Sequence, residues 1–166
     1  MSEQPIPEND VLIGTALWLH NKGWQIKQIS MASGQNIDQP ANKRKIIAEF
    51  SRMGIKQEAI RFMSNGPDIE VLKADMKMKI ECKGMGEVRI QTLRNNFDRA
   101  VASAVSYYDL PIESNLQIGL AVPESYLKLI KTRLPQPLRE RINLWLFLYV
   151  AINKIRVFEP RDTILD

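Results

Sequence analysis

The residues with the clearest chemical potential are two acids and a lysine in the middle of the chain. Asp68 follows Pro67, and Glu81 and Lys83 flank Cys82 further along. Two carboxylates beside an ammonium group can hold a divalent cation and activate water next to a phosphate. This combination therefore indicates hydrolysis of a phosphate ester.

Alternating apolar residues predict that the same segment forms two strands folded back on each other. Ile69 and Val71 alternate with other residues in the first half, and the second half repeats the pattern at Met76, Met78, Ile80 and Cys82. Alternation with a period of two is typical of strands. Successive side chains then point to opposite faces, so Glu81 and Lys83 share one face while Cys82 points to the core. Such a hairpin brings Asp68 next to Glu81.

The chemistry of these groups predicts a magnesium or manganese site. Mg²⁺ prefers oxygen ligands and usually takes one or two carboxylates. Asp68 and Glu81 supply these carboxylates, and the backbone carbonyl of Cys82 is a third candidate ligand. Lys83 is expected to orient or deprotonate the attacking water, or to neutralise charge on the phosphate.

At these residues the chain resembles the restriction-endonuclease-like, or PD-(D/E)xK, nuclease superfamily. Pro67-Asp68 matches the Pro-Asp at the start of one strand, and Glu81-Cys82-Lys83 matches the Asp/Glu-x-Lys of the next. The resemblance implies an α/β fold with a central mixed β-sheet flanked by helices, in which a helix, three strands, a helix and a further strand form the core (αβββαβ). It also implies Mg²⁺-dependent cleavage of DNA phosphodiester bonds.

The rest of the chain predicts elements in a compatible order within one domain, 1–166, that has a helical or loop insert at about 30–65 and additions after the core. A first helix is expected to begin at Pro7-Glu8 and end at Gly23. The other expected elements are a strand at Trp24–Ile29, a loop at Ser30–Pro40, a helix at Lys43–Met53 that continues or is followed by a second helix at Ile55–Met63, a helix at Glu87–Tyr108, a strand at Leu116–Val122, a helix at Tyr126–Leu134, a helical turn at Leu138–Ile142, and strands at Leu144–Ile152 and Ile155–Phe158.

Two further polar residues are candidates for the site. Glu8 opens the first helix, where related nucleases often carry an acid that arranges the metal or its water; it would equally stabilise the helix dipole. Gln91 opens the long helix after the motif, where it would support Lys83, contact a substrate phosphate or lie on a solvated face. Asn95 stands where the Gln-x-x-x-Tyr pattern of exonuclease-type relatives has a tyrosine. This departure weakens the case for end-dependent cleavage.

Composition sets wider bounds. The chain has 166 residues, 45% hydrophobic and 25% charged, which is typical of a globular domain. Its longest apolar run, Leu144–Ile152, is short of the ~20 residues that span a bilayer. Met1–Asp10 is polar and acidic, so secretion is not expected. The single cysteine, Cys82, fits a reducing cytoplasm.

The net charge of +4 is compatible with DNA as a partner. Basic residues gather in the insert at Lys43-Arg44-Lys45, with Arg52, Lys56 and Arg61 following. They either bind phosphates or form an ordinary solvated surface.

Three functional classes follow from the sequence. The first is a Mg²⁺-dependent DNA endonuclease, acting alone, as a homodimer or with a partner subunit. The second is a nuclease-fold module that binds DNA or a protein without cutting, as an accessory subunit of a restriction, recombination or mobile-element system. The third is an unrelated metal-dependent hydrolase of nucleotides. Metal binding through Asp68 and Glu81 separates the first class from the second.

Overall fold

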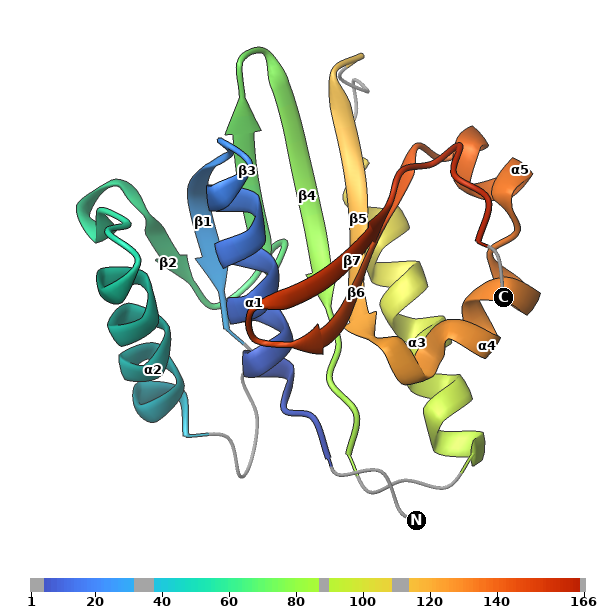
Figure 1. Ribbon diagram of the computed structural model, residues 1–166, viewed down its shortest axis with the longest axis horizontal. Coiled ribbons are helices and arrows are strands. Elements are labelled where there is room, and N and C mark those ends of the chain that lie inside the picture. The colour runs from blue at the N-terminus through green and yellow to red at the C-terminus, as the bar shows by residue number, and fades with distance from the viewer. Residues whose placement is uncertain (1–4, 32–37, 87–89, 109–113, 165–166) are drawn as a thin grey trace.

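A seven-stranded mixed β-sheet with helices on both faces forms the centre of the molecule (Figure 1). The computed structural model describes residues 5–31, 38–86, 90–108 and 114–164. The strands are β1 (Gln25–Ser30), β2 (Arg61–Met63), β3 (Ile69–Lys73), β4 (Met76–Cys82), β5 (Leu116–Pro123), β6 (Leu144–Ala151) and β7 (Lys154–Phe158). The helices are α1 (Glu8–Asn21), α2 (Gln39–Arg52), α3 (Ile90–Ser106), α4 (Leu127–Arg133) and α5 (Gln136–Arg141), with short 3-10 helices at Gln57–Ala59 and Glu124–Tyr126.

The strands lie in the order β2-β1-β3-β4-β5-β6-β7. β1, β3 and β4 are antiparallel neighbours, whereas β5 and β6 run parallel to β4. β4 and β5 therefore need a crossover connection, and α3 supplies it. The predicted α/β fold with a mixed sheet flanked by helices is present, and α1, β1, β3, β4, α3 and β5 follow one another along the chain with α2 and β2 inserted after β1. β2 is inserted into this series, and β7 closes the opposite edge of the sheet.

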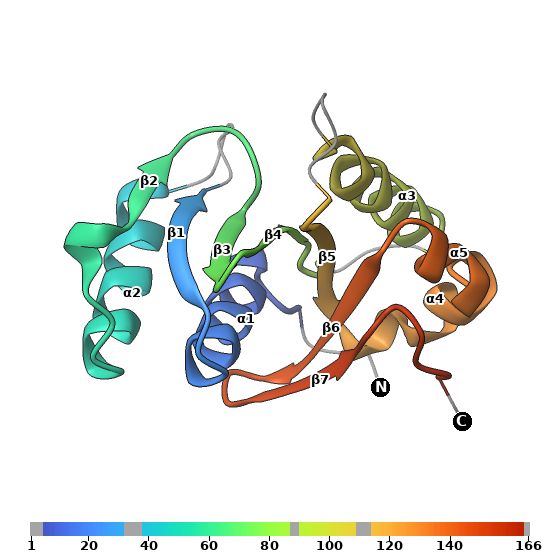
Figure 2. The same ribbon diagram turned by 90° about the horizontal axis from the view of Figure 1, so that it is seen from above.

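Helices lie on both faces of the sheet (Figure 2), and each face carries a hydrophobic core. α1 and α2 cover one face, where Phe50 of α2 shares a core with Ile80 and Cys82 of β4. α3 and α4 cover the other face, where Phe97 of α3 shares a core with Leu120 of β5. Cys82 is only 1% exposed, as the alternation of β4 predicts. The alternate side chains of β4, Glu81 among them, consequently lie on the face of the sheet that α3 covers.

Helix α1 begins and ends where the sequence predicts. Pro7 is the N-cap residue, and Glu8 and Asp10 lie in the first turn, at the positive end of the helix dipole. The helix ends before Gly23, whose φ of 82° is a left-handed conformation that glycine adopts without a steric penalty. α1 therefore presents two carboxylates at one end of the sheet.

The stretch Ile55–Met63 differs from its predicted helical structure. It contains the 3-10 helix at Gln57–Ala59 and then β2, which pairs in parallel with β1 from Gln28↔Arg61 to Ser30↔Met63. A three-residue edge strand is too short to show a clear alternation, so its pairing with β1 decides the structure. The insert thus widens the sheet by one strand.

Helix α2 begins at Gln39, four residues before the predicted start at Lys43. The side chain of Asp38 accepts a hydrogen bond from the backbone N–H of Ala41 at 2.9 Å and caps the helix. An Asp at the N-cap position satisfies an N–H that lacks an intrahelical partner. This cap, together with Pro40 in the first turn, accounts for the longer helix.

The other expected elements agree closely with the structure. Of the predicted loop Ser30–Pro40, positions 32–37 lie outside the described residues, and its ends belong to β1 and α2. Positions 87–89 of the predicted helix Glu87–Tyr108 also lie outside them, and the remainder forms α3. Beyond position 114, each predicted strand and helix is present with similar bounds. Among the helices of the described ranges, none is long and apolar enough to cross a membrane.

Candidate active site

The β3–β4 hairpin sets Asp68 and Glu81 side by side. Ile69 pairs with Ile80, so continuing the register by one residue places Asp68 opposite Glu81. Residues directly opposite in an antiparallel pair have their side chains on the same face. Ile69 and Ile80 are buried in the α1 core, which leaves the two carboxylates on the face toward α3. Ala74, with φ at 53°, lies in the two-residue turn that fixes this register.

Asp68 is held by the backbone on both sides of it. Its Oδ2 accepts a hydrogen bond from the N–H of Cys82 at 2.7 Å, and its carbonyl oxygen accepts one from the N–H of Ser30 at 2.9 Å. The hydroxyl of Ser30 also donates to the carbonyl of Asn65 at 2.7 Å. Gly66, with φ at 87°, allows the sharp entry into β3. The carboxylate is therefore placed before any ligand arrives.

The carbonyl of Cys82 faces the same side of β4 as Asp68. In a strand the N–H and C=O of one residue point to one side, and the next residue points to the other. The N–H of Cys82 reaches Asp68, while that of Lys83 donates to Ala121 on β5 at 2.8 Å. Burial raises the pKa of the Cys82 thiol well above its ordinary value, so the sulfur is neutral and only the main chain of this residue serves the site.

Glu81 is anchored to α3. Its Oε2 accepts a short hydrogen bond from the hydroxyl of Tyr107, the residue after the end of α3. The side chain of Ser103, four residues earlier on the helix, also favours the ionised form of Glu81 and so lowers its pKa slightly. Neither Tyr107 nor Ser103 stands out in the sequence, because no motif links them to Glu81. Their place along the amphipathic α3 and directly after it is the signal that the sequence offers.

Lys83 and Glu8 form an ion pair at the end of β4. The Nζ of Lys83 lies 2.7 Å from Oε2 of Glu8, and the side chains are 35% and 27% exposed. The N-terminal segment holds Glu8 in place because Ile6 and Met85 form an antiparallel bridge, with N···O distances of 2.6 and 2.8 Å. Gly84 precedes Met85 and packs directly against the Glu8 backbone. A Cβ atom at this position would lie 2.4 Å from the Glu8 nitrogen.

The carboxylates of this site repel one another. Burial is the main cause that raises the pKa of Asp68 well above its ordinary value, and the nearby Glu81 carboxylate raises it further. Burial also raises the pKa of Glu81, although the hydrogen bond from Tyr107 opposes this shift. Lys83 favours the ionised form of both acids but does not reverse either shift. A cation bound between them would relieve the repulsion.

Gln91 is not in contact with this cluster in the described structure. Its side chain is exposed, and its Nε2 donates to Oδ1 of Asn95 at 3.1 Å. It lies in the first turn of α3, whereas Tyr107, which bonds Glu81, follows the last turn. Nearly the whole length of the helix thus separates Gln91 from the anchored carboxylate.

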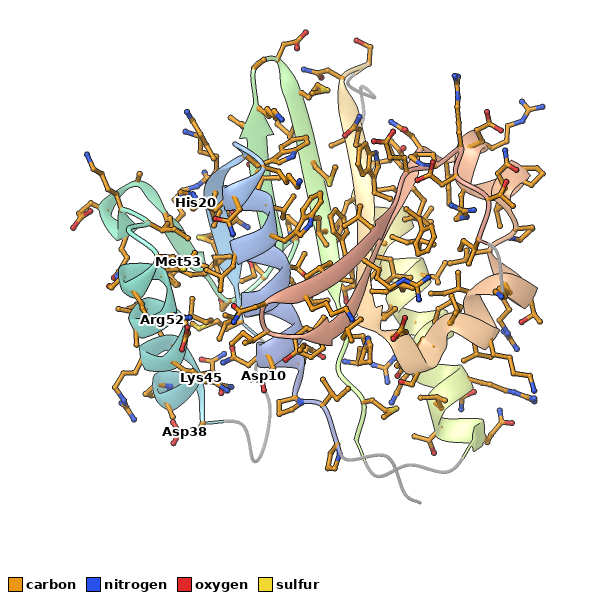
Figure 3. All side chains as sticks on the ribbon, in the orientation of Figure 1. Asp10, His20, Asp38, Lys45, Arg52 and Met53 are labelled. Carbon is orange, nitrogen blue, oxygen red and sulfur yellow. The ribbon has the colours of Figure 1, made fainter. Side chains whose placement is uncertain are left out.

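Three of the four basic residues of α2, Lys43, Lys45 and Arg52, already have partners. Figure 3 shows Lys45 beside Asp10 between α2 and α1, and the two form an ion pair. Arg52 pairs with Glu49 at 2.8 Å, and the Nζ of Lys43 lies over the ring of Phe62 at 4.9 Å from its centroid. The helix packs on the sheet face opposite to the side chains of Asp68 and Glu81.

Among the residues that the structure describes, no group of three or more His, Cys, Asp and Glu side chains is arranged to hold a metal ion. The described histidine, His20, lies at the end of α1 remote from Glu8 (Figure 3). The site therefore offers two adjacent carboxylates and a main-chain carbonyl. This small set of hard oxygen donors still fits Mg²⁺ or Mn²⁺, because Mg²⁺ commonly keeps several waters and takes one or two carboxylates.

No family model, curated protein or solved structure matches the chain.

Proposed function

We propose that this protein is a Mg²⁺- or Mn²⁺-dependent endonuclease that hydrolyses phosphodiester bonds in DNA. The observation that carries the proposal is the placement of Asp68 and Glu81 on one face of the β3–β4 hairpin, where burial raises both pKa values and neighbouring carboxylates, Glu81 and Glu8 for Asp68 and Glu8 for Glu81, raise them further. Lys83 directly follows β4 and pairs with Glu8 at the same end of the sheet. Two carboxylates with raised pKa values beside an ammonium group suit metal-assisted phosphate chemistry.

The residues divide the work as follows. Asp68 and Glu81, with the Cys82 carbonyl, would hold the ion, which when bound makes water more acidic and stabilises charge on the phosphate. Asp68 is already oriented by the Cys82 N–H, and Glu81 by Tyr107. Lys83 donates to the phosphate oxygens or orients the attacking water. Glu8 holds the Lys83 ammonium within reach of the phosphate, or binds the ion directly.

The arrangement of the core supports a restriction-endonuclease-like fold. The series α1, β1, β3, β4, α3 and β5 has the order that the sequence resemblance implies, with Asp68 at the entry to β3 and the Glu81–Lys83 motif at the end of β4. DNA as the substrate agrees with the net charge of +4. The unpaired, buried Cys82 agrees with a cytoplasmic location. A contact between Gln91 and the substrate is also part of this proposal.

Plasmid cleavage tests the function directly. The wild-type chain and Asp68→Ala are incubated with supercoiled, linear and branched DNA in Mg²⁺ or Mn²⁺, and with EDTA as the metal-free control. We expect nicking or linearisation by the wild type with metal and loss of cleavage in the variant. Equal cleavage by Asp68→Ala, or undiminished cleavage in EDTA, contradicts the proposal.

A second candidate is a binding module of the same architecture that does not cut. The Glu8–Lys83 pair favours it, because a lysine already neutralised by a carboxylate serves a structural role without any substrate. Such a module needs no divalent ion at Asp68 and Glu81. DNA binding that EDTA leaves unchanged, together with the absence of cleavage on all three DNA forms, would select this candidate.

A further inference from the structure

We propose that Tyr107 is the positioning residue of the metal site, acting through Glu81 to set the affinity for the divalent ion. This inference rests on the proposed function, because it assigns Glu81 as a metal ligand. The juxtaposition that supports it is a tyrosine hydroxyl directed from the end of α3 onto the Glu81 carboxylate of β4.

Tyr107 is fixed to β4 at two points. Its hydroxyl donates to Oε2 of Glu81, and its carbonyl oxygen accepts a hydrogen bond from Nζ of Lys79 at 3.4 Å. Lys79 and Glu81 are two residues apart, so both project from the same face of the strand. The tyrosine thus lies along β4, with its ring partly shielded from solvent.

A single donor on Oε2 has a defined effect on the carboxylate. It restricts the rotamer of Glu81 and leaves Oε1 as the oxygen with more capacity for an ion. The Ser103 side chain, one turn earlier on the same helix, also favours the ionised form of Glu81. A long, flexible glutamate side chain otherwise loses rotamer freedom when it binds an ion, and prior anchoring removes part of that cost. Outer hydrogen-bond partners of metal ligands act in this way.

The neighbouring tyrosine provides a matched comparison. Tyr108 also uses its hydroxyl, but it donates to the backbone carbonyl of Ile142 at 2.6 Å. Removing either hydroxyl deletes one hydrogen bond from the same end of α3. Only the substitution of Tyr107 releases a carboxylate of the site, because Tyr108 bonds a backbone carbonyl. Comparing the two variants therefore separates a positioning role of Tyr107 from a general contribution to stability.

The test measures metal binding and cleavage with the full chain. Mn²⁺ is titrated into metal-free wild type, Tyr107→Phe, Tyr108→Phe and Glu81→Gln by calorimetry, and the Mn²⁺ concentration for half-maximal plasmid cleavage is determined in parallel. We expect Tyr107→Phe to weaken Mn²⁺ binding by about 10-fold or more, with the cleavage rate largely recovered at saturating Mn²⁺. Tyr108→Phe should bind Mn²⁺ as the wild type does. Thermal unfolding checks that both variants are folded.

The outcomes separate this inference from the function on which it rests. If Glu81→Gln abolishes Mn²⁺ binding but Tyr107→Phe binds as tightly as the wild type, the positioning role is overturned and the metal site stands. Equal weakening in Tyr107→Phe and Tyr108→Phe also overturns it, since that result indicates a general effect on α3. A wild-type chain that binds no Mn²⁺ overturns both the positioning role and the proposed function.

Discussion

Two lysine–carboxylate pairs lie at the first turn of α1, and they differ in their surroundings more than in their geometry. Glu8 pairs with Lys83 at the end of β4, and Asp10 pairs with Lys45 of α2 (Figure 3). The exposed fractions are similar: 27% and 35% for the first pair, 25% and 48% for the second. The Lys83 pair, however, shares its region with Asp68 and Glu81, whose pKa values are raised partly by the charge of Glu8.

The contrast shows that an ion pair is by itself a weak sign of function. Partly exposed pairs contribute roughly 0–1 kcal/mol to stability and occur on most proteins. What distinguishes the Glu8–Lys83 region is that three acids, Glu8, Asp68 and Glu81, gather around Lys83. Burial raises the pKa of two of them, Asp68 and Glu81, and Lys83 does not reverse either shift. The Asp10–Lys45 pair thus serves as an internal control for each experiment at the site.

The largest expected difference concerns the two lysines. Lys83→Ala should lower the rate of DNA cleavage by about 10²–10⁴-fold, the usual contribution of a positioned acid–base or charge-stabilising group. Lys45→Ala should leave the rate within about twofold of wild type, because a surface pair carries little energy. Initial rates of plasmid nicking in Mg²⁺ measure both. Similar rates for the two variants would remove the distinction between the regions.

A smaller difference is expected for the two acids of α1. Glu8→Gln keeps the shape of the side chain but releases the Lys83 ammonium, so cleavage should fall by roughly 10-fold, as for other supporting partners of a site. Asp10→Asn releases Lys45 and should not change the rate. The ratio of kcat to KM for a defined oligonucleotide measures both. Full activity of Glu8→Gln would restrict Glu8 to stabilising the helix dipole.

The smallest expected effect is on stability, and its sign differs between the regions. A raised pKa means that folded Asp68 holds its proton more tightly than the unfolded chain does, so metal-free stability falls as pH rises from about 4 through the raised pKa. Asp68→Asn removes this penalty while keeping an acceptor for the Cys82 N–H, and should raise the free energy of unfolding at pH 7. Asp10→Asn should lower it by roughly 0–1 kcal/mol.

Urea unfolding in EDTA between pH 4 and pH 8 measures this effect. The gain in Asp68→Asn should shrink as the pH falls and be small near pH 4, where the wild-type carboxyl is protonated in the folded state and about half protonated in the unfolded one. A variant that is less stable than wild type at pH 7 would show that burial and neighbouring charges cost the ionised Asp68 little free energy.

The local parts of the site could be predicted from the sequence. The alternation through Ile80 and Cys82 fixes which face of β4 carries Glu81, and a two-residue turn then sets Asp68 opposite to it. The alternation of apolar residues, the length of the turn and the register of the hairpin all depend on residues close together in the chain. They can therefore be predicted from a single sequence. The order of helices and strands after position 114 is equally local in origin.

The remaining parts depend on contacts between distant segments. β2 forms because Arg61–Met63 pairs with the edge of β1. Three residues are too few to show the apolar alternation from which a strand is predicted. Tyr107 reaches Glu81 across 26 positions, and Lys83 reaches Glu8 across 75. Hydrogen bonds of this kind follow from how α1 and α3 pack on the sheet, which periodicity does not specify.

The close approach of Gly84 to the Ile6–Glu8 segment has a consequence for how the protein is made. Residues near the start of the chain are synthesised first, yet Ile6 has its partner in Met85. Until β4 has left the ribosome, this opening segment has no strand to join, and the closure of so long a loop is entropically slow. Synthesis of the β3–β4 residues therefore precedes the Glu8–Lys83 pairing. A nascent chain would acquire its full set of charged groups at the site only after the whole of β4 has been synthesised.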